Sequence, residues 1–178
     1  MEIKPAAGLR HWLKIYPLYR NAFPKAERKP FSIIRKNQKM GKSDIWYFEE
    51  NGVFAGLATT VNGENGMVLL DYFAVSKKHR DQGWGSRMLP LILQKYEGRR
   101  LFGEIELVNE GAENYDICNR RKQFYLRLGL TALGVKVKLF GVDMELMSNG
   151  CQVSFAEYLE FYRKNIGEFA LKNISELK

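Results

Sequence analysis

The chain has 178 residues, a formal net charge of +8, and a composition in which 46% of residues are hydrophobic and 27% are charged. This balance is typical of a globular protein with its own core, and neither repeats nor low-complexity segments interrupt it. No apolar run approaches the roughly 20 residues of a membrane-spanning helix, and Met1–Arg10 lacks the apolar region of a signal peptide. We therefore expect a single domain over residues 1–178 and no membrane partner.

Two cysteines, Cys118 and Cys151, form neither a metal-binding nor a redox motif. We therefore expect free thiols in a reducing cytoplasm, and no metal site. Positive charge is concentrated between residues 25 and 42, which hold seven Lys or Arg and one acid, Glu27. Aromatic residues do not interleave with these charges as they do on base-stacking surfaces. A solvated basic face is expected and no nucleic-acid partner, although an anionic cofactor would also suit this charge.

The N-terminal part of the chain predicts two helices. Apolar residues at helical spacing indicate the first over residues 9–22, and Pro17 should kink or divide it. Pro30 is expected to open a shorter helix that runs through Met40 and ends at Gly41.

Three strands follow, and they predict an antiparallel meander because strands that are neighbours in sequence usually pair. They are expected at residues 44–50, 53–61 and 67–75. Asn51-Gly52 is a dipeptide that two-residue hairpin turns prefer, so the first two strands should form a hairpin.

Helices and strands alternate in the second half, where Gly98 and Gly129 stand at expected helix ends and Gly141 at a turn. The expected elements are a helix from Ser86 to about Glu97, a strand at 101–108, a helix that carries Tyr125, and closing strands at 132–140 and 142–147. This order predicts an α/β fold, with an α+β mixed sheet and helices on its faces.

A last helix is expected at about 154–176, because Ser154 and Glu157 form a capping box. Its apolar stripe should pack into the core, with a dimer contact as the alternative, so a monomer and a homodimer both stay open. The stripe consists of Phe155, Tyr158, Leu159, Tyr162 and Ile166.

The segment His79-Arg80-Asp81-Gln82-Gly83-Trp84-Gly85 follows the third strand and precedes a helix. A glycine-rich turn that opens a helix exposes backbone N–H groups and the positive end of the helix dipole, which suits a diphosphate. The dinucleotide motif G-x-G-x-x-G fails because Met88 stands at its last position, and no nucleoside-triphosphate loop motif occurs.

What remains is R-x-x-G-x-G after a strand that ends in Phe-Ala-Val, and it resembles the pyrophosphate-binding loop of the GNAT N-acetyltransferases. A second segment, Phe124-Tyr125-Leu126-Arg127-Leu128-Gly129-Leu130, is similar to the family's F-Y-x-x-x-G-F and has Leu130 in place of Phe. The resemblance covers roughly residues 45–147 and leaves the C-terminal helix as an addition. It implies a GNAT-like acyl-CoA N-acyltransferase fold and a transferase that uses acetyl-CoA as donor and no metal.

The resemblance also implies which residues bind acetyl-CoA. The backbone of Phe73, Ala74 and Val75 would pair with the pantetheine arm, and a backbone N–H there would polarise the carbonyl. Asn119 stands one place later than the family's asparagine, where this chain has Cys118, so its contact with the donor stays open. The pyrophosphate would bind to Arg80, Asp81, Gln82, Gly83, Trp84, Gly85 and Ser86.

Two acids are candidates for the general base. Glu104 and Glu106 share one face of their strand, which could instead be a polar face turned to solvent. The phrase Leu-Phe-Gly-Glu-Ile resembles the Leu-x-x-Glu-Val of bacterial N-terminal protein acetyltransferases, which implies Glu104 as base, directly or through water. Asp71 is expected to make a structural hydrogen bond, and His79 to be a surface residue.

Tyr125 is the candidate general acid, since a phenol can protonate the departing thiolate. The alternative is a core aromatic with a bonded hydroxyl. We thus expect acetyl transfer to a primary amine of a small molecule or peptide, by direct attack in a ternary complex. The alternative is a catalytically silent GNAT-fold module that binds CoA or a partner, and the sequence does not predict which amine is the acceptor.

Overall fold

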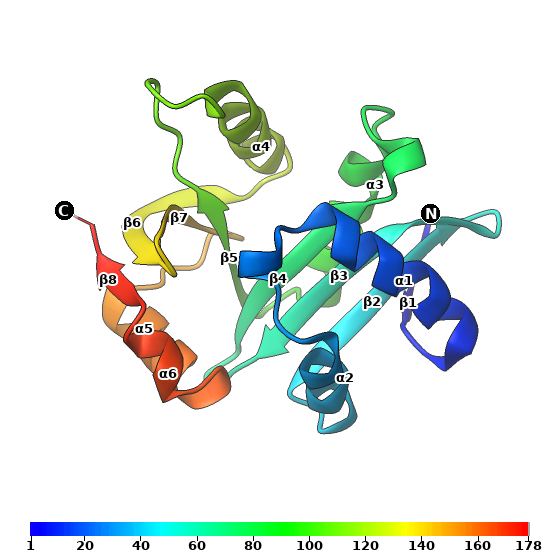
Figure 1. Cartoon of the computed structure of the whole chain (residues 1–178), viewed down its shortest axis with the longest axis horizontal. Helices are drawn as coiled ribbons and strands as arrows, with labels where there is room; N and C mark the ends of the chain where they lie inside the picture. Colours follow the sequence, from blue (N-terminus) through cyan, green and yellow to red (C-terminus); the bar gives the residue numbers. More distant parts are fainter. Residues whose placement is uncertain (178) are drawn as a thin grey trace. The chain divides into compact units, whose positions relative to one another are not determined.

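The structure is a computed structural model that describes residues 1–177. Its contacts divide the chain into two compact units (Figure 1). The first unit comprises residues 1–62 and 70–97, and the second comprises residues 63–69 and those from 98 onward. In the described part of the chain, no helix combines the length and the apolar character needed to cross a membrane.

The strands of the first unit follow the order β1-β2-β3-β4. They are β1 (Glu2–Pro5), β2 (Ser43–Glu50), β3 (Val53–Asn62) and β4 (Met67–Val75), and the last six residues of β4 belong to this unit. Strand β2 pairs antiparallel with both β1 and β3. Asn51 and Gly52 have φ values of 50° and 76°, which confirms the predicted two-residue hairpin turn. Strand β1 was not expected.

Two helices cover one face of these strands, α1 (Gly8–Ala22) on β3 and α2 (Phe31–Lys39) on β2 (Figure 1). A short 3-10 turn, η1 (Lys25–Glu27), lies between the two helices in the chain. Pro17 was expected to kink or divide the first helix, and the second of these alternatives is wrong. Residues on both sides of the proline are buried in one cluster, and this packing keeps α1 a single element. The cluster includes Ile15, Leu18, Tyr19, Ile34, Ile45, Tyr47, Leu57 and Tyr72.

The third helix, α3 (Trp84–Lys95), packs on the face opposite to α1, and Gly56 of β3 sets how closely it does so. Leu57 belongs to the cluster under α1, so its neighbour Gly56 points to the other face. A Cβ on Gly56 would lie 2.6 Å from Cε of Met88 in α3 and 2.3 Å from the carbonyl oxygen of Ala74 in β4. Only glycine therefore fits between helix and strand at this spacing.

The second unit is built on four strands in the order β5-β7-β6-β8, and its pairs are antiparallel. Phe140 and Gly141 have φ values of 48° and 85° and form the predicted turn between β6 and β7. The elements in chain order are β5 (Arg100–Glu106), α4 (Tyr115–Arg127), β6 (Thr131–Leu139), β7 (Val142–Ser148), α5 (Phe155–Asn165), α6 (Glu168–Leu171) and β8 (Ile174–Glu176).

The predicted capping box is confirmed, since the Ser154 hydroxyl accepts from the Glu157 amide and the Glu157 carboxylate accepts from the Ser154 amide. The predicted helix over 154–176 is wrong in its length. Helix α5 ends at Asn165 because Gly167 has a φ of 122°, which no helical residue adopts, and the amides of Ile166 and Gly167 both donate to the Tyr162 carbonyl. The rest of the predicted helix forms α6 and a strand, β8, that pairs with β6.

Candidate active site

The loop between β4 and α3 in the first unit is built as a strand-to-helix turn with left-handed residues. After Val75 comes a 3-10 turn, η2 (Lys77–His79), and then Asp81 and Gly83 with φ values of 59° and 73°. Gly83 is the N-cap of α3, which begins at Trp84, two residues earlier than expected. The last three residues of the predicted loop are therefore the first turn of the helix.

The N-terminus of α3 is open to a ligand. No side chain caps it, and its first turn contains no acid. The first-turn N–H groups have no partners inside the helix, and together with the dipole they favour an anion. Gly83 is exposed, and a Cβ added to it would meet no atom within 4 Å, so the space above it is free. These features fit a diphosphate, the group by which CoA is bound in the expected family.

Side chains brace this loop from outside. The imidazole of His79 stacks on the indole of Trp84, with ring centroids 3.9 Å apart. The guanidinium of Arg87 lies 4.9 Å from the same indole and donates to both carboxylate oxygens of Glu50 at 2.6 Å. His79 is half-buried in this stack, although a surface position was expected.

Arg80 and Gln82 are exposed, and their side chains donate to carbonyls at the end of β4 and in η2. The Arg80 Nε donates to the Val75 carbonyl at 3.4 Å, and the Gln82 amide donates to the Lys78 carbonyl at 3.0 Å. The terminal nitrogens of Arg80 lie on an exposed side chain, where they can reach a phosphate.

The end of β4 is partly buried. Ala74 is buried, whereas Phe73 and Val75 are half-buried, and the Phe73 ring lies 6.5 Å from the Phe48 ring in an edge-to-face contact. These side chains therefore contribute to packing.

In the second unit, Glu104 of β5 is held by two tyrosines of α5. Its Oε1 atom accepts hydrogen bonds from the hydroxyls of Tyr158 and Tyr162, each at 2.7 Å. Both tyrosines are buried, and burial followed by the charge of Glu104 raises the pKa of the Tyr158 phenol well above its usual value. The Tyr158 phenol therefore keeps its proton at neutral pH, and the two hydroxyls together fix the position of the carboxylate.

Glu106, two residues further along β5, is bound by a different helix. The side-chain amide of Asn114, the N-cap residue of α4, donates to its Oε1 at 2.6 Å. Burial raises the pKa of the Cys118 thiol, and the nearby charge of Glu106 raises it further. Glu106 is thus tied to the start of α4, and neither acid is a simply solvated side chain.

Tyr125 lies in the last turn of α4 and is half-buried, with its ring 5.1 Å from that of Phe124. Burial raises the pKa of Tyr125 to about 12, against the opposing effect of the Arg121 charge. The phenol therefore carries its proton at neutral pH. On the same helix Cys118 is buried and Asn119 is half-buried, so the thiol occupies the packed position.

The two tyrosines that bind Glu104 were expected only as members of an apolar stripe. Their burial confirms that they pack into the core, but their hydroxyls give them a second contact. The signal was present in the sequence, since Tyr rather than Leu at positions four residues apart places two donors on one helix face. Asp71 also behaves as expected, because it makes a structural contact with the Lys29 ammonium at 2.7 Å.

Comparison with known proteins adds independent evidence. A model of the acetyltransferase (GNAT) family matches residues 12–129, more than half of the chain. A structure from Bacteroides thetaiotaomicron that is assigned to the GNAT acetyltransferases aligns with a TM-score of 0.78 and 19% identity, over 96% of this chain and 99% of that one. Among curated protein sequences, none matches this chain significantly.

Two further structures have lower scores. The ribosomal-protein-S18-alanine N-acetyltransferase from Escherichia coli gives a TM-score of 0.63 with 18% identity, over 86% of this chain and 95% of that one. An aminoglycoside 6′-N-acetyltransferase complexed with coenzyme A gives 0.64 with 14% identity, over 86% and 100%. At such identities the likeness establishes the fold alone, and it confirms the predicted GNAT-like α/β fold. Together with the family match, it shows that the chain belongs to the acetyltransferase (GNAT) family.

Proposed function

We propose that this chain is an acetyl-CoA-dependent N-acetyltransferase that moves an acetyl group to a primary amine by direct attack in a ternary complex. The observation that carries the proposal is the left-handed Gly83, which opens the uncapped N-terminus of α3 directly after β4. Membership of the GNAT family supports it, as do structural neighbours that include N-acetyltransferases and a CoA complex.

The loop would bind the donor, since acetyl-CoA supplies the acetyl group as a thioester. The amides from Arg80 to Ser86 would bind the diphosphate, and the exposed Arg80 would add its charge. The backbone of Phe73–Val75 would pair with the pantetheine arm, and an N–H in this segment would polarise the thioester carbonyl.

Proton transfer would fall to Glu104 and Tyr125. Glu104 would take the proton of the ammonium, directly or through water, and the free amine would form the C–N bond to the carbonyl carbon. Tyr125 would give its proton to the thiolate as the C–S bond breaks, and the second proton, which the nitrogen loses as the amide forms, would restore the phenol through solvent. Glu106 is the second candidate for the base, and its bond to Asn114 orients it from α4.

The remaining expectations belong to the same proposal. We propose one domain over residues 1–178, and the family match draws on residues of both compact units, which supports this. The acceptor would be a small molecule or peptide in the cytoplasm, with no metal, nucleic acid or membrane required. The chain would act as a monomer or a homodimer.

Replacing Gly83 by valine tests the donor site. Gly83→Val puts a branched side chain into the open space above the loop, so we expect acetyl-CoA affinity to fall by at least tenfold in calorimetry. Gly98→Val is the matched control, because Gly98 has the same φ of 73° and equally open surroundings just after α3. Wild-type affinity in folded Gly83→Val, or an equal loss in Gly98→Val, would contradict the donor site.

Release of free CoA thiol in the presence of polyamines, aminoglycosides, amino acids and peptides tests the transfer itself. Amine-dependent release supports the enzyme. Tight binding of acetyl-CoA with no release for any amine would favour the catalytically silent module instead.

A further inference from the structure

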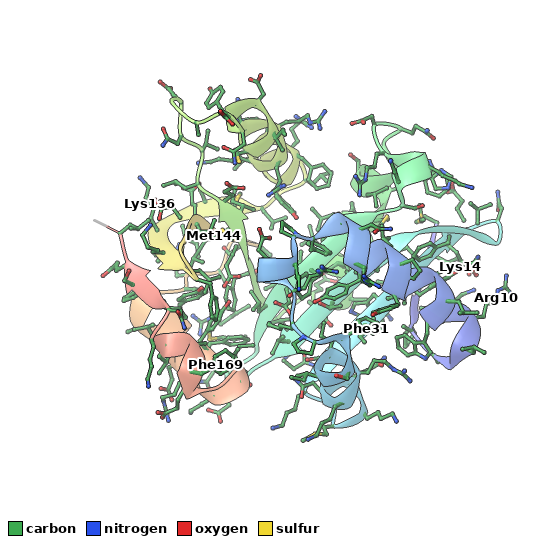
Figure 2. The ribbon with its side chains drawn as sticks, in the orientation of Figure 1. Arg10, Lys14, Phe31, Lys136, Met144 and Phe169 are labelled. Atoms are coloured by element: carbon green, nitrogen blue, oxygen red, sulfur yellow. The ribbon has the colours of Figure 1, made fainter. Side chains whose placement is uncertain are left out.

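A hollow of about 770 Å³ lies in the first unit, between α1, η1 and the start of α2. Its volume falls in the usual range of small-ligand sites, roughly 300–1,000 Å³. Figure 2 labels Phe31, which stands at the start of α2 on the side of α1. The lining residues are Trp12, Leu13, Tyr16, Pro17, Tyr19, Arg20, Lys25, Arg28, Lys29, Pro30, Phe31, Ser32 and Arg35.

The hollow is strongly cationic, because its lining holds five Lys or Arg and no acid. Lys29 is ion-paired with Asp71. Within residues 1–177, no ion pair is formed by Arg20, Lys25, Arg28 or Arg35. The Nε atom of Arg28 is buried without a hydrogen-bond partner in this part of the chain. The Nη1 atom of the same guanidinium donates to the Arg20 carbonyl at 3.1 Å, which holds the charge of Arg28 at the wall of the hollow.

Aromatic rings stand beside these charges. The Phe31 ring is in contact with three rings of α1, those of Trp12, Tyr16 and Tyr19, at centroid distances of 6.1, 5.3 and 5.4 Å. The guanidinium of Arg35 lies 4.6 Å from the Trp12 ring. Leu13 and Tyr16 are 66% and 44% exposed, so the lining offers apolar surface next to positive charge.

The first turn of α2 adds to the positive potential. Pro30, Phe31 and Ser32 line the hollow, no side chain caps this helix, and its first turn contains no acid. The helix dipole therefore acts in the same direction as the arginines.

Hydrogen bonds tie the wall of the hollow to β4. The Tyr72 hydroxyl donates to the Glu27 carbonyl at 2.7 Å and accepts from the Lys29 amide at 3.1 Å. The Tyr19 hydroxyl donates to the Lys29 carbonyl at 2.8 Å. Tyr72 directly precedes Phe73, and Val75 lies three residues further along the strand, about 10 Å at the usual rise. The hollow is thus anchored beside the strand segment proposed to hold the acetyl donor.

We infer that this hollow binds the anionic group of the acceptor, and that the acceptor is an amine with a carboxylate or phosphate next to an apolar group. That the ligand is the acceptor rests on the proposed function. Binding of an anion in the hollow does not depend on catalysis. Arginine binds either anion through paired hydrogen bonds, and the rings hold the apolar part.

Binding without chemistry tests the site first. In calorimetry, we expect N-acetylphenylalanine, phenyl phosphate or both to bind the wild-type protein, and neutral N-acetylphenethylamine to bind at least tenfold more weakly. The carboxylate and phosphate arms show which anion the site prefers. Arg35→Gln should weaken binding of the preferred anion about tenfold, as expected for a lost charged hydrogen bond. Arg20→Gln, at an exposed residue, repeats the test if Arg35→Gln fails to fold.

Arg10→Gln is the matched control, because Arg10 is an exposed α1 arginine outside the lining (Figure 2). It should bind the preferred anion like the wild type. Equal affinity for the anionic and neutral probes, or an equal loss in Arg10→Gln and Arg35→Gln, would overturn the anion site.

Turnover then tests the acceptor class with matched amines. We expect phenylalanine to exceed phenethylamine, or phosphotyramine to exceed tyramine, by at least tenfold in kcat/KM, and Arg35→Gln to reduce this preference. Turnover that is indifferent to the anion would overturn the acceptor class and leave the proposed function standing. Anion binding that depends on Arg35, with no turnover of any amine, would support the site and remove the proposed function.

Discussion

Burial determines what Tyr125 can do chemically. A phenol whose pKa is raised to about 12 keeps its proton at neutral pH, so it can donate but cannot act as a base. The thiol of the leaving group has a pKa near 8.5, so this phenol is a weak acid that helps only as negative charge develops on sulfur.

Tyr125→Phe removes a single oxygen and should leave the packing of α4 nearly unchanged. We expect turnover to fall by roughly 10²-fold, the usual scale for a lost general acid, while acetyl-CoA affinity stays within a few-fold. Thiol release and calorimetry measure the two quantities. Wild-type turnover with chemistry rate-limiting would make Tyr125 a packing residue only.

Glu104→Gln tests the base with little change in shape. The amide oxygen can still accept from the two tyrosine hydroxyls, so the fold should be retained, but the group can no longer take a proton. We expect the rate to fall by about 10²-fold or more and the acidic limb of the pH–rate profile to change. Glu106→Gln, measured alongside, should have the smaller effect, and an unchanged profile in Glu104→Gln would move the role to Glu106 or to water.

Helix α5 influences the protonation of Glu104 on β5, because two of its tyrosines donate hydrogen bonds to that carboxylate. Removing phenol donors makes the Glu104 carboxylate easier to protonate. We therefore expect Tyr158→Phe and Tyr162→Phe to shift the acidic limb of the pH–rate profile to higher pH, with a larger shift in the double variant. Phe161→Leu is a control that alters the same buried face of α5 without removing a donor. Activity lost at all pH values without a shift would mean that α5 only supports the fold.

Short sequence signals predicted most helices and strands of the chain, because the residues that determine each turn or helix start are close together in the sequence. Asn51-Gly52, Phe140-Gly141 and the Ser154 capping box each determine their own backbone geometry, and all three form as expected. The edge strands β1 and β8 escaped prediction because a strand of three or four residues is stable only through its partner. For the same reason no pattern pairs Glu104 with tyrosines 54 and 58 residues away.

The candidate functional residues likewise include a part that the local sequence predicts and a part that it does not. The loop from Arg80 to Ser86 was visible as a motif because consecutive residues form it. The cationic hollow was visible only as a charge-rich segment, and was expected to be a solvated face. Its concave form depends on α1 and α2 meeting at Phe31, which the sequence does not reveal.

Buried phenols in both compact units should make the fold sensitive to alkali. Burial is the largest cause that raises the pKa of Tyr19, Tyr72, Tyr96, Tyr125 and Tyr158. A raised folded-state pKa contributes stability that is fully present below the unfolded value, about 10, and is lost as pH rises above it. As the pH rises from about 10 to the folded-state pKa, each such tyrosine reduces the free energy of unfolding by up to about 1.4 kcal/mol per pH unit.

We therefore expect the midpoint of denaturant unfolding to fall slightly from pH 8 to 9.5, where the raised pKa of the Cys118 thiol already has an effect, and to fall steeply by pH 11. Circular dichroism follows the transition, and tyrosinate absorbance should rise together with unfolding. Tyrosinate that forms below the transition, in the folded protein, would contradict the prediction.

The three tryptophans of the chain stand in three different surroundings. Trp84 stacks on His79 at the start of α3, Trp12 lies under Arg35 in the hollow, and Trp46 is buried, with its indole N–H bonded to the Tyr96 hydroxyl at 3.1 Å. Indole emission depends on its immediate environment, so the molecule carries an unlabelled optical reporter for each candidate site and a reference in its core. In single-tryptophan variants, a ligand at the loop would change the wavelength or intensity of Trp84 emission. A ligand in the hollow would change the emission of Trp12.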